Sequence, residues 1–146
     1  MIDCHIQLKQ GQFDLDQRFQ SDQPVIGLFG ASGSGKTTIL HSIAGLVTPQ
    51  AGWIKIKNQT WFDQAQKINL STQQRRIGLV FQDAQLFPHK NVKQNLLFGF
   101  KHIQPQQRQF EVDYIIELLK LEHLIERMPI KLSGGEKQRV ALGRAL

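Results

Sequence analysis

The sequence contains a single cysteine, Cys4, among its 146 residues. One thiol cannot form a disulfide within the chain, and scarce cysteine is typical of a reducing compartment. No apolar run reaches the roughly 18 residues that span a bilayer. Residues 1–5 lack the basic and then apolar stretches of a signal peptide, so we expect none. We therefore expect a globular domain, or most of a larger one, in which Cys4 is a strand residue rather than a reactive thiol.

Basic residues outnumber acidic ones, with 18 Lys and Arg against 12 Asp and Glu, which gives a net charge of +6. Such an excess is compatible with nucleic-acid binding. However, the basic residues are scattered, and no aromatic residues alternate with them as base-stacking sites require. The pattern favours a solvated basic surface near phosphate groups or an anionic membrane, and we expect no nucleic-acid partner.

Alternating apolar and polar residues predict an antiparallel β layer. Residues 2–8 form the first expected strand, and residues 13–19 suggest a second one that runs antiparallel to it. Residues 53–57 and 60–62 flank an Asn-Gln turn, which predicts a hairpin.

Two apolar runs, residues 25–29 and 77–81, have the composition of parallel strands that are buried on both faces. A helix is expected after the first run, from Lys36 to about Leu46, with Gly45 as a stop signal. At helical spacing, the predicted inner face of this helix consists of Ile39, Leu40, Ile43 and Ala44.

The pattern becomes helical after Gln82. The expected segments are amphipathic helices over residues 91–100 and 107–121, a turn at 124–128, and a helix from Ser133 to the last residue. We therefore divide the chain into a β layer with an α/β nucleotide-binding core (1–82), a helical subdomain (83–132) and a final helix (133–146).

Residues 30–37 match the phosphate-loop pattern G-x-x-x-x-G-K-[ST] between an expected strand and an expected helix. Glycines let successive N–H groups point at phosphate oxygens, and the helix N-terminus adds its dipole. Lys36 is suited to neutralise the β- and γ-phosphates, Thr37 to ligate Mg²⁺ and Thr38 to contact the α-phosphate. A glycine-rich turn without a ligand is the alternative, which this context disfavours. The predicted ATP-binding residues here are Gly30, Ala31, Ser32, Gly33, Ser34, Gly35, Lys36, Thr37 and Thr38.

A second glycine motif has the sequence Leu-Ser-Gly-Gly-Glu-Lys-Gln-Arg over residues 132–139. By itself, Ser133 with Glu136 three residues later is a capping box, which has a purely structural role. The Ser133 hydroxyl and the N–H groups of Gly134 and Gly135 could also face a phosphate from the start of a helix.

With the phosphate loop and Gln82 before it, this second motif resembles the signature motif of ABC-type ATPases, and Gln82 resembles their Q-loop glutamine. The resemblance covers the whole chain and implies an α/β P-loop NTPase core with an N-terminal antiparallel β layer and a helical insertion. It also implies a head-to-tail homodimer, in which Ser133, Gly134 and Gly135 of one subunit close over ATP held by Lys36 of the other. Gln82 would help to position Mg²⁺ and water.

Residues 80–89, followed by Asn91 and Val92, are similar to importer-type ABC ATPases and most similar to the molybdate-importing group. This implies a peripheral subunit at the cytoplasmic face of the inner membrane that couples ATP hydrolysis to solute uptake. It would bind a permease through residues 82–92 and depend indirectly on a periplasmic solute-binding protein. Importers of sulfate, phosphate compounds and sugars share much of this pattern and stay open as alternatives.

The chain departs from the family pattern after the signature motif. The family has an apolar strand ending in Asp-Glu and then a switch histidine, and neither follows Ser133 here. We therefore expect a C-terminally incomplete ABC domain with weak ATP hydrolysis and unpaired core strands. Phe13 is the nearest candidate to stack on adenine, and a core phenylalanine is the alternative interpretation.

The sequence leaves two other function classes open. One is a soluble ABC ATPase of DNA repair or translation, although such proteins usually carry long insertions or duplicated ATPase halves. The other is a non-catalytic nucleotide-binding fragment.

Overall fold

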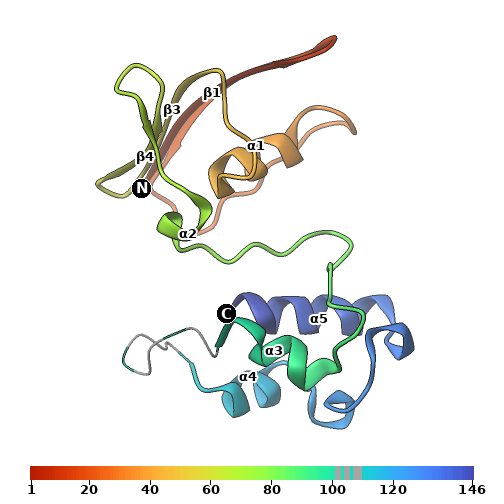
Figure 1. Cartoon of the computed structure of the whole chain (residues 1–146). Helices are drawn as coiled ribbons and strands as arrows, with labels where there is room; N and C mark the ends of the chain where they lie inside the picture. Colours follow the sequence, from red (N-terminus) through yellow and green to blue (C-terminus); the bar gives the residue numbers. More distant parts are fainter. Residues whose placement is uncertain (101–102, 104–105, 107–109) are drawn as a thin grey trace. The chain divides into compact units, whose positions relative to one another are not determined.

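The computed structural model describes residues 1–100, 103, 106 and 110–146, and the chain forms two compact units, Met1–Ile77 and Gly78–Leu146 (Figure 1). The first unit contains β1 (Ile2–Gln10), β2 (Phe13–Ser21), α1 (Lys36–Ala44), β3 (Ala51–Ile56), β4 (Gln59–Asp63), β5 (Ile68–Asn69) and α2 (Thr72–Arg75). The second contains α3 (Val92–Phe100), α4 (Val112–Leu118), two 3-10 helices (Glu122–Leu124 and Pro129–Lys131) and α5 (Gly134–Ala145). In the part of the chain that the structure describes, no helix has the length and apolarity needed to cross a membrane.

The strands of the first unit form one antiparallel sheet in the order β2-β1-β3-β4-β5. Cys4 of β1 pairs with Phe19 of β2 on one side and with Ile54 of β3 on the other. The predicted strands 2–8 and 13–19 and the hairpin of 53–57 with 60–62 are therefore confirmed.

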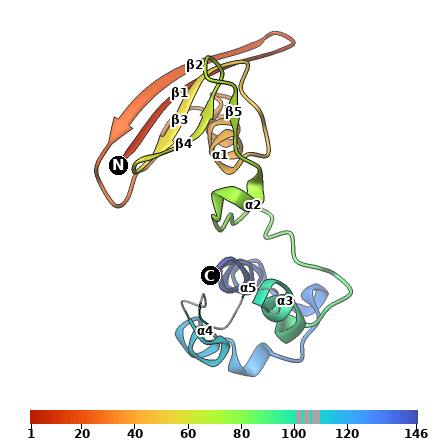
Figure 2. The ribbon, with the colours of Figure 1, turned by 60° about the vertical axis from the view of Figure 1, so that its left-hand side comes forward.

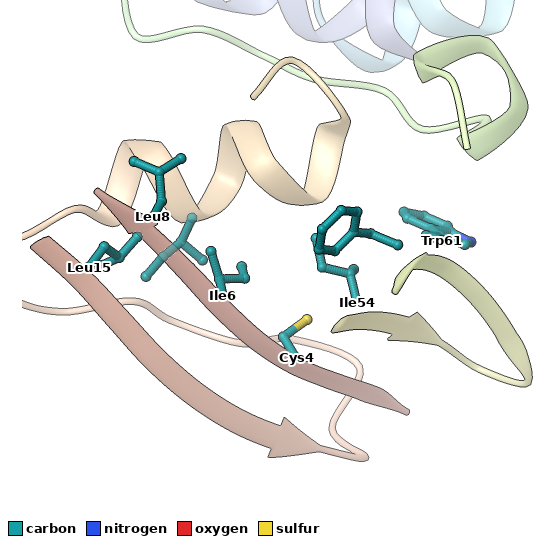
Figure 3. Packing of buried hydrophobic residues seen from close by; sticks show 8 residues of the cluster. Cys4, Ile6, Leu8, Leu15, Ile54 and Trp61 are labelled. Atoms are coloured by element: carbon teal, nitrogen blue, oxygen red, sulfur yellow. The ribbon is translucent and has the colours of Figure 1, made fainter. Parts of the chain in front are cut away.

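Helix α1 covers one face of this sheet (Figure 2). Cys4, Ile6 and Ile54 alternate along their strands toward this face and are fully buried (Figure 3). Burial raises the pKa of the Cys4 thiol to about 12, so the thiol is protonated at neutral pH. Cys4 is thus a buried strand residue, as its alternating pattern predicted.

Helix α1 ends at Ala44, somewhat earlier than expected, because Gly45 adopts a left-handed conformation (φ 79°) and its N–H bonds back to the helix. The prediction that Leu40 lies on the inner face is wrong, because this side chain is 47% exposed. Ile39 and Ile43 take the sheet-facing positions one turn apart, and Leu40 lies about 100° further around the helix.

The predicted parallel strands at 25–29 and 77–81 are not strands in the structure. Both segments are irregular, and the side chains of Val25 and Phe29 are 84% and 97% exposed. A parallel strand requires neighbours that supply its backbone hydrogen bonds, and among the described residues neither segment pairs with a strand. The two runs are therefore not buried in the way that their apolar composition predicts.

Arg75, at the end of α2, fastens the C-terminal end of α1 and is 3% exposed. Its Nη1 atom donates to the carbonyls of Ser42 (2.6 Å) and Ile43 (2.7 Å). Its Nε atom donates to the Leu70 carbonyl at 3.0 Å, and Nη2 donates to Asn69 Oδ1 at 3.1 Å. Burial lowers the pKa of Arg75. A cation at a helix C-terminus is favoured by the helix dipole, so Arg75 stabilises the helix that follows the phosphate loop.

The second unit packs α3, α4 and α5 around a core that includes Leu96, Leu121 and Val140. Helix α3 and the Ser133-capped helix α5 are confirmed. Helix α4 covers the middle of the predicted 107–121 helix, and residues 107–109 lie outside the described residues. It stops early because Lys120 adopts a left-handed conformation (φ 53°). The expected turn at 124–128 begins earlier, as the 3-10 helix Glu122–Leu124.

We expect Arg75→Ala to lower the free energy of unfolding of the first unit by about 3 kcal/mol, because it removes a set of charge-assisted hydrogen bonds at a buried site. Both tryptophans, Trp53 and Trp61, lie in this unit, so denaturant unfolding followed by tryptophan fluorescence reports on it alone. The neighbouring Arg76 is exposed, and Arg76→Ala is the matched control with an expected effect within about 0.5 kcal/mol. Equal losses in the two variants would contradict the role given to Arg75.

Candidate functional site

The phosphate loop, residues 30–35, leads directly into α1 and is closed by the side chain of Lys36. The Lys36 ammonium donates to the carbonyls of Gly30 (2.8 Å) and Ala31 (2.7 Å) and lies 3.4 Å from Ser34 Oγ. The Lys36 ammonium thus lies at the loop, where it could contact a bound anion.

The start of α1 leaves its N–H groups available. Gly35 is the N-cap residue, and no side chain caps the helix there. Free N–H groups at a helix N-terminus, together with the helix dipole, favour an anion. Thr37 and Thr38 follow in the first turn, with Thr37 exposed and Thr38 half-buried. Their predicted contacts with Mg²⁺ and the α-phosphate remain predictions.

Gly35 is buried, and its position requires glycine for two reasons. Its φ of 92° is in the left-handed region, and an added Cβ would lie 2.8 Å from Leu15 Cδ1 and 3.0 Å from Phe13 Cζ. The loop therefore rests directly on β2. Phe13, the candidate for adenine stacking, packs against the core beside Gly35, as the alternative interpretation expected.

The second motif begins α5 with a complete capping box. The Ser133 N–H donates to Glu136 Oε2 at 2.6 Å, and the Glu136 N–H donates to Ser133 Oγ at 3.3 Å. These bonds hold the pKa of Glu136 below its usual value, with the Ser133 backbone N–H as the main cause. The motif therefore has the helix-capping role that the sequence left open for it.

The capping box does not explain the two glycines after Ser133. Among the described residues, an added Cβ at Gly134 or Gly135 would meet nothing within 4 Å, and neither residue has a positive φ. The packing of this unit therefore does not require glycine at either position. Exposed glycines at a helix start allow close approach of a group from outside the unit.

Gln82 is exposed, and its backbone is bound to the signature helix α5. The Gln138 side-chain amide donates to the carbonyls of Phe81 (3.3 Å) and Gln82. The structure thus brings Gln82 and the signature motif into one unit, while the phosphate loop lies in the other.

Three polar residues of this unit were not singled out from sequence: Asn95, Gln138 and Arg144. A signal existed for Asn95, because it lies within the apolar stripe of α3 beside Val92 and Leu96. A polar residue at a core position usually has hydrogen-bond partners, and the structure supplies them for Asn95.

Comparisons with known proteins agree with this arrangement. Among curated proteins, the chain is 46% identical over 146 residues to the molybdenum import ATP-binding protein ModC of Paramagnetospirillum magneticum, covering 100% of this chain and 40% of that protein. It is 45% identical over 147 residues to the protein of the same name from Haemophilus influenzae, covering 100% of this chain and 41% of that protein. The chain thus spans about 40% of the length of these relatives.

Solved structures of ATP-binding cassettes share the fold. The ATP-binding cassette MJ0796 in a post-hydrolysis dimer with ADP and Pi aligns with a TM-score of 0.71 at 29% identity, covering 100% of this chain and 69% of that chain. CbiO1 from Clostridium perfringens, part of the ABC transporter complex cbiONQ, aligns with a TM-score of 0.71 at 25% identity, covering 99% and 60%. The expected P-loop fold with an antiparallel β layer and a helical region is confirmed. A family model described as ABC transporter matches residues 14–146, and the chain therefore belongs to the ABC transporter family.

Proposed function

We propose that this chain is the ATP-binding part of an ABC importer that couples ATP binding and hydrolysis to uptake of molybdate or a similar oxyanion. The observation that carries the nucleotide role is Lys36, whose ammonium closes a loop at the uncapped start of α1. The oxyanion assignment is supported by the ModC relatives, named as molybdenum import proteins.

The residues of the loop have distinct roles toward ATP. Lys36 exchanges its bonds to loop carbonyls for bonds to the β- and γ-phosphates, while the N–H groups of residues 33–37 surround the phosphate oxygens. Thr38 contacts the α-phosphate. The loop supplies positive charge where the triphosphate carries most of its negative charge.

Oxygen donors for Mg²⁺ are present on the chain. Mg²⁺ prefers oxygen ligands and takes one or two from a protein, with the remainder from phosphates and water. Thr37 and Gln82 are both exposed, and we propose the Thr37 hydroxyl as one oxygen donor and the Gln82 amide oxygen as another. When bound, the ion would neutralise charge on the phosphates.

A second copy of the chain completes the nucleotide site in this proposal. Ser133, Gly134 and Gly135 face the γ-phosphate of ATP bound to the phosphate loop of the partner. This role is supported by two glycines at the start of a capped helix that no contact in the described part of the chain requires.

Residues 82–92 form the proposed contact with a permease at the cytoplasmic face of the membrane. Leu86 packs against the core of the second unit. Pro88 and His89 are exposed, and the Phe87 ring lies 4.3 Å from that of Phe98, which is 46% exposed. The contact surface we propose therefore consists of residues 87–89 with Phe98. A periplasmic solute-binding protein acts through the permease.

Lys36→Ala should lower ATP affinity by about tenfold to a hundredfold, because a charge-assisted hydrogen bond to phosphate is lost. Isothermal calorimetry with ATP and Mg²⁺ measures the effect. Lys9 is an exposed lysine of β1 in the same unit, and Lys9→Ala is the matched control that should leave affinity unchanged. Equal affinity in the parent and the Lys36 variant would sink the nucleotide assignment.

Cysteines introduced at positions 88 and 89 should cross-link to the permease in the assembled transporter, whereas a cysteine at position 86, where the native Leu86 is half-buried and packs against the core of the second unit, should not. The native Cys4 gives little background because it is buried and its pKa is raised. A cysteine at exposed position 117 on α4 serves as the negative control. Absence of cross-links from 88 and 89 in an active transporter, or equal cross-linking from 117, would count against the proposed contact.

A further inference from the structure

Segment 81–91 of the second unit has no sheet or helix ladder, and side chains from the neighbouring helices hold its backbone. Asn95 of α3, which is fully buried, holds the C-terminal half. Its Oδ1 atom accepts from the Phe87 N–H at 2.8 Å, and its Nδ2 atom donates to the carbonyls of Phe87 (3.2 Å), Lys90 (2.9 Å) and Asn91 (3.0 Å). One side chain therefore supplies hydrogen-bond partners to the backbone of this half of the segment, as a neighbouring strand would in a sheet.

Helix α5 holds the N-terminal half of the segment with two side chains. Gln138 donates to the carbonyls of Phe81 and Gln82. Arg144 donates through Nη1 to the Gln85 carbonyl (2.9 Å) and through Nη2 to the Ala84 carbonyl (3.3 Å). Its guanidinium carbon also lies 5.1 Å from the centre of the Phe87 ring. The two side chains are about 9 Å apart along the helix axis, so they hold the backbone at two separate points.

The backbone at the second of these points, which Arg144 holds, is strained. Ala84 and Gln85 both have positive φ values, of 60° and 42°. Non-glycine residues adopt this conformation at a cost and keep it where surrounding contacts impose it. The carbonyls of these two residues are the ones that Arg144 binds, and Ala84 is 2% exposed. The side chains from α5 thus impose a defined shape on a segment that would otherwise relax.

We infer that Gln138 and Arg144 are positioning residues that fix segment 81–87 to the signature helix, so that a displacement of this segment is passed on to Ser133, Gly134 and Gly135. Gln138 lies in the second turn of the helix whose first turn carries the signature glycines. Ser133 is the N-cap residue of α5, and Gln138 lies in the same continuous helix. Movement of the segment therefore requires movement of the helix start. This inference rests on the proposed function, because it takes the permease to be what displaces residues 87–89.

A purely structural role predicts a different outcome on mutation. If these bonds only stabilised the fold, their loss would loosen the whole second unit and would not separate nucleotide binding from transport. If they position the segment, their loss loosens residues 81–87 alone and leaves ATP affinity intact, because the hydrogen bonds described for them go to backbone carbonyls of residues 81–85.

The test uses the intact transporter with Gln138→Glu and Arg144→Ala. Glu keeps the shape of Gln but cannot donate, and Arg144→Lys restores one donor as a conservative rescue. Lys93→Ala removes an exposed cation of α3 as the control. The measurements are hydrogen exchange of residues 81–91, ATP affinity, and solute uptake per ATP hydrolysed.

We expect exchange at residues 81–87 to rise roughly tenfold or more in both variants, since a hydrogen bond that fixes the local backbone is lost. ATP affinity should stay at the parental value, while uptake per ATP should fall several-fold. Arg144→Lys should recover part of the coupling, and Lys93→Ala should match the parent. If Arg144→Ala does not fold, the isosteric Gln138→Glu decides.

Unchanged exchange at 81–87, or loosened exchange with unchanged coupling in both variants, would overturn the inference. A uniform rise in exchange across the second unit would overturn it in favour of a structural role. Failure of the proposed function is a separate result, because it would appear in the parent protein as absence of ATP binding or of ATP-dependent uptake.

Discussion

The close contact between Gly35 and β2 is the constraint on which the candidate site depends. No side chain fits at this position, because a Cβ would meet Leu15 and Phe13 at 3.0 Å or less. The phosphate loop thus packs directly on the antiparallel sheet, and this contact fixes the position at which α1 begins. Arg75 fixes the other end of α1 with bonds to its last carbonyls. The orientation of the helix dipole toward the loop follows from these two contacts.

In the second unit, the segment that contains Gln82 has no regular secondary structure, so its shape depends on contacts with side chains. Three polar side chains, Asn95, Gln138 and Arg144, supply the hydrogen bonds that a ladder would supply elsewhere. Because two of them come from α5, the segment that contains Gln82 and the helix that carries the signature motif share one set of contacts. Both units therefore place a functional loop by bonding it to a helix.

Elements that have a local sequence signal were predictable from sequence. The strands 2–8 and 13–19 alternate strictly enough to reveal their buried face, and Ser133 with Glu136 identified the start of α5. The runs 25–29 and 77–81 were predicted wrongly, because apolar composition indicates a buried strand only when partner strands are beside it. The contacts of Gln138 and Arg144 were not predictable, since they bind carbonyls about 60 residues away in sequence, and no local pattern encodes such a pairing.

In the proposed function, the loop before α1 recognises the triphosphate of ATP rather than its base. The most direct test is amide NMR of the chain titrated with ATP and Mg²⁺, and in parallel with adenosine. The amides of residues 33–37, in the loop and the first turn of α1, should shift strongly with ATP and remain nearly unchanged with adenosine at the same concentration. Equal shifts with the two ligands, or shifts with ATP that bypass this loop, would contradict the proposed recognition.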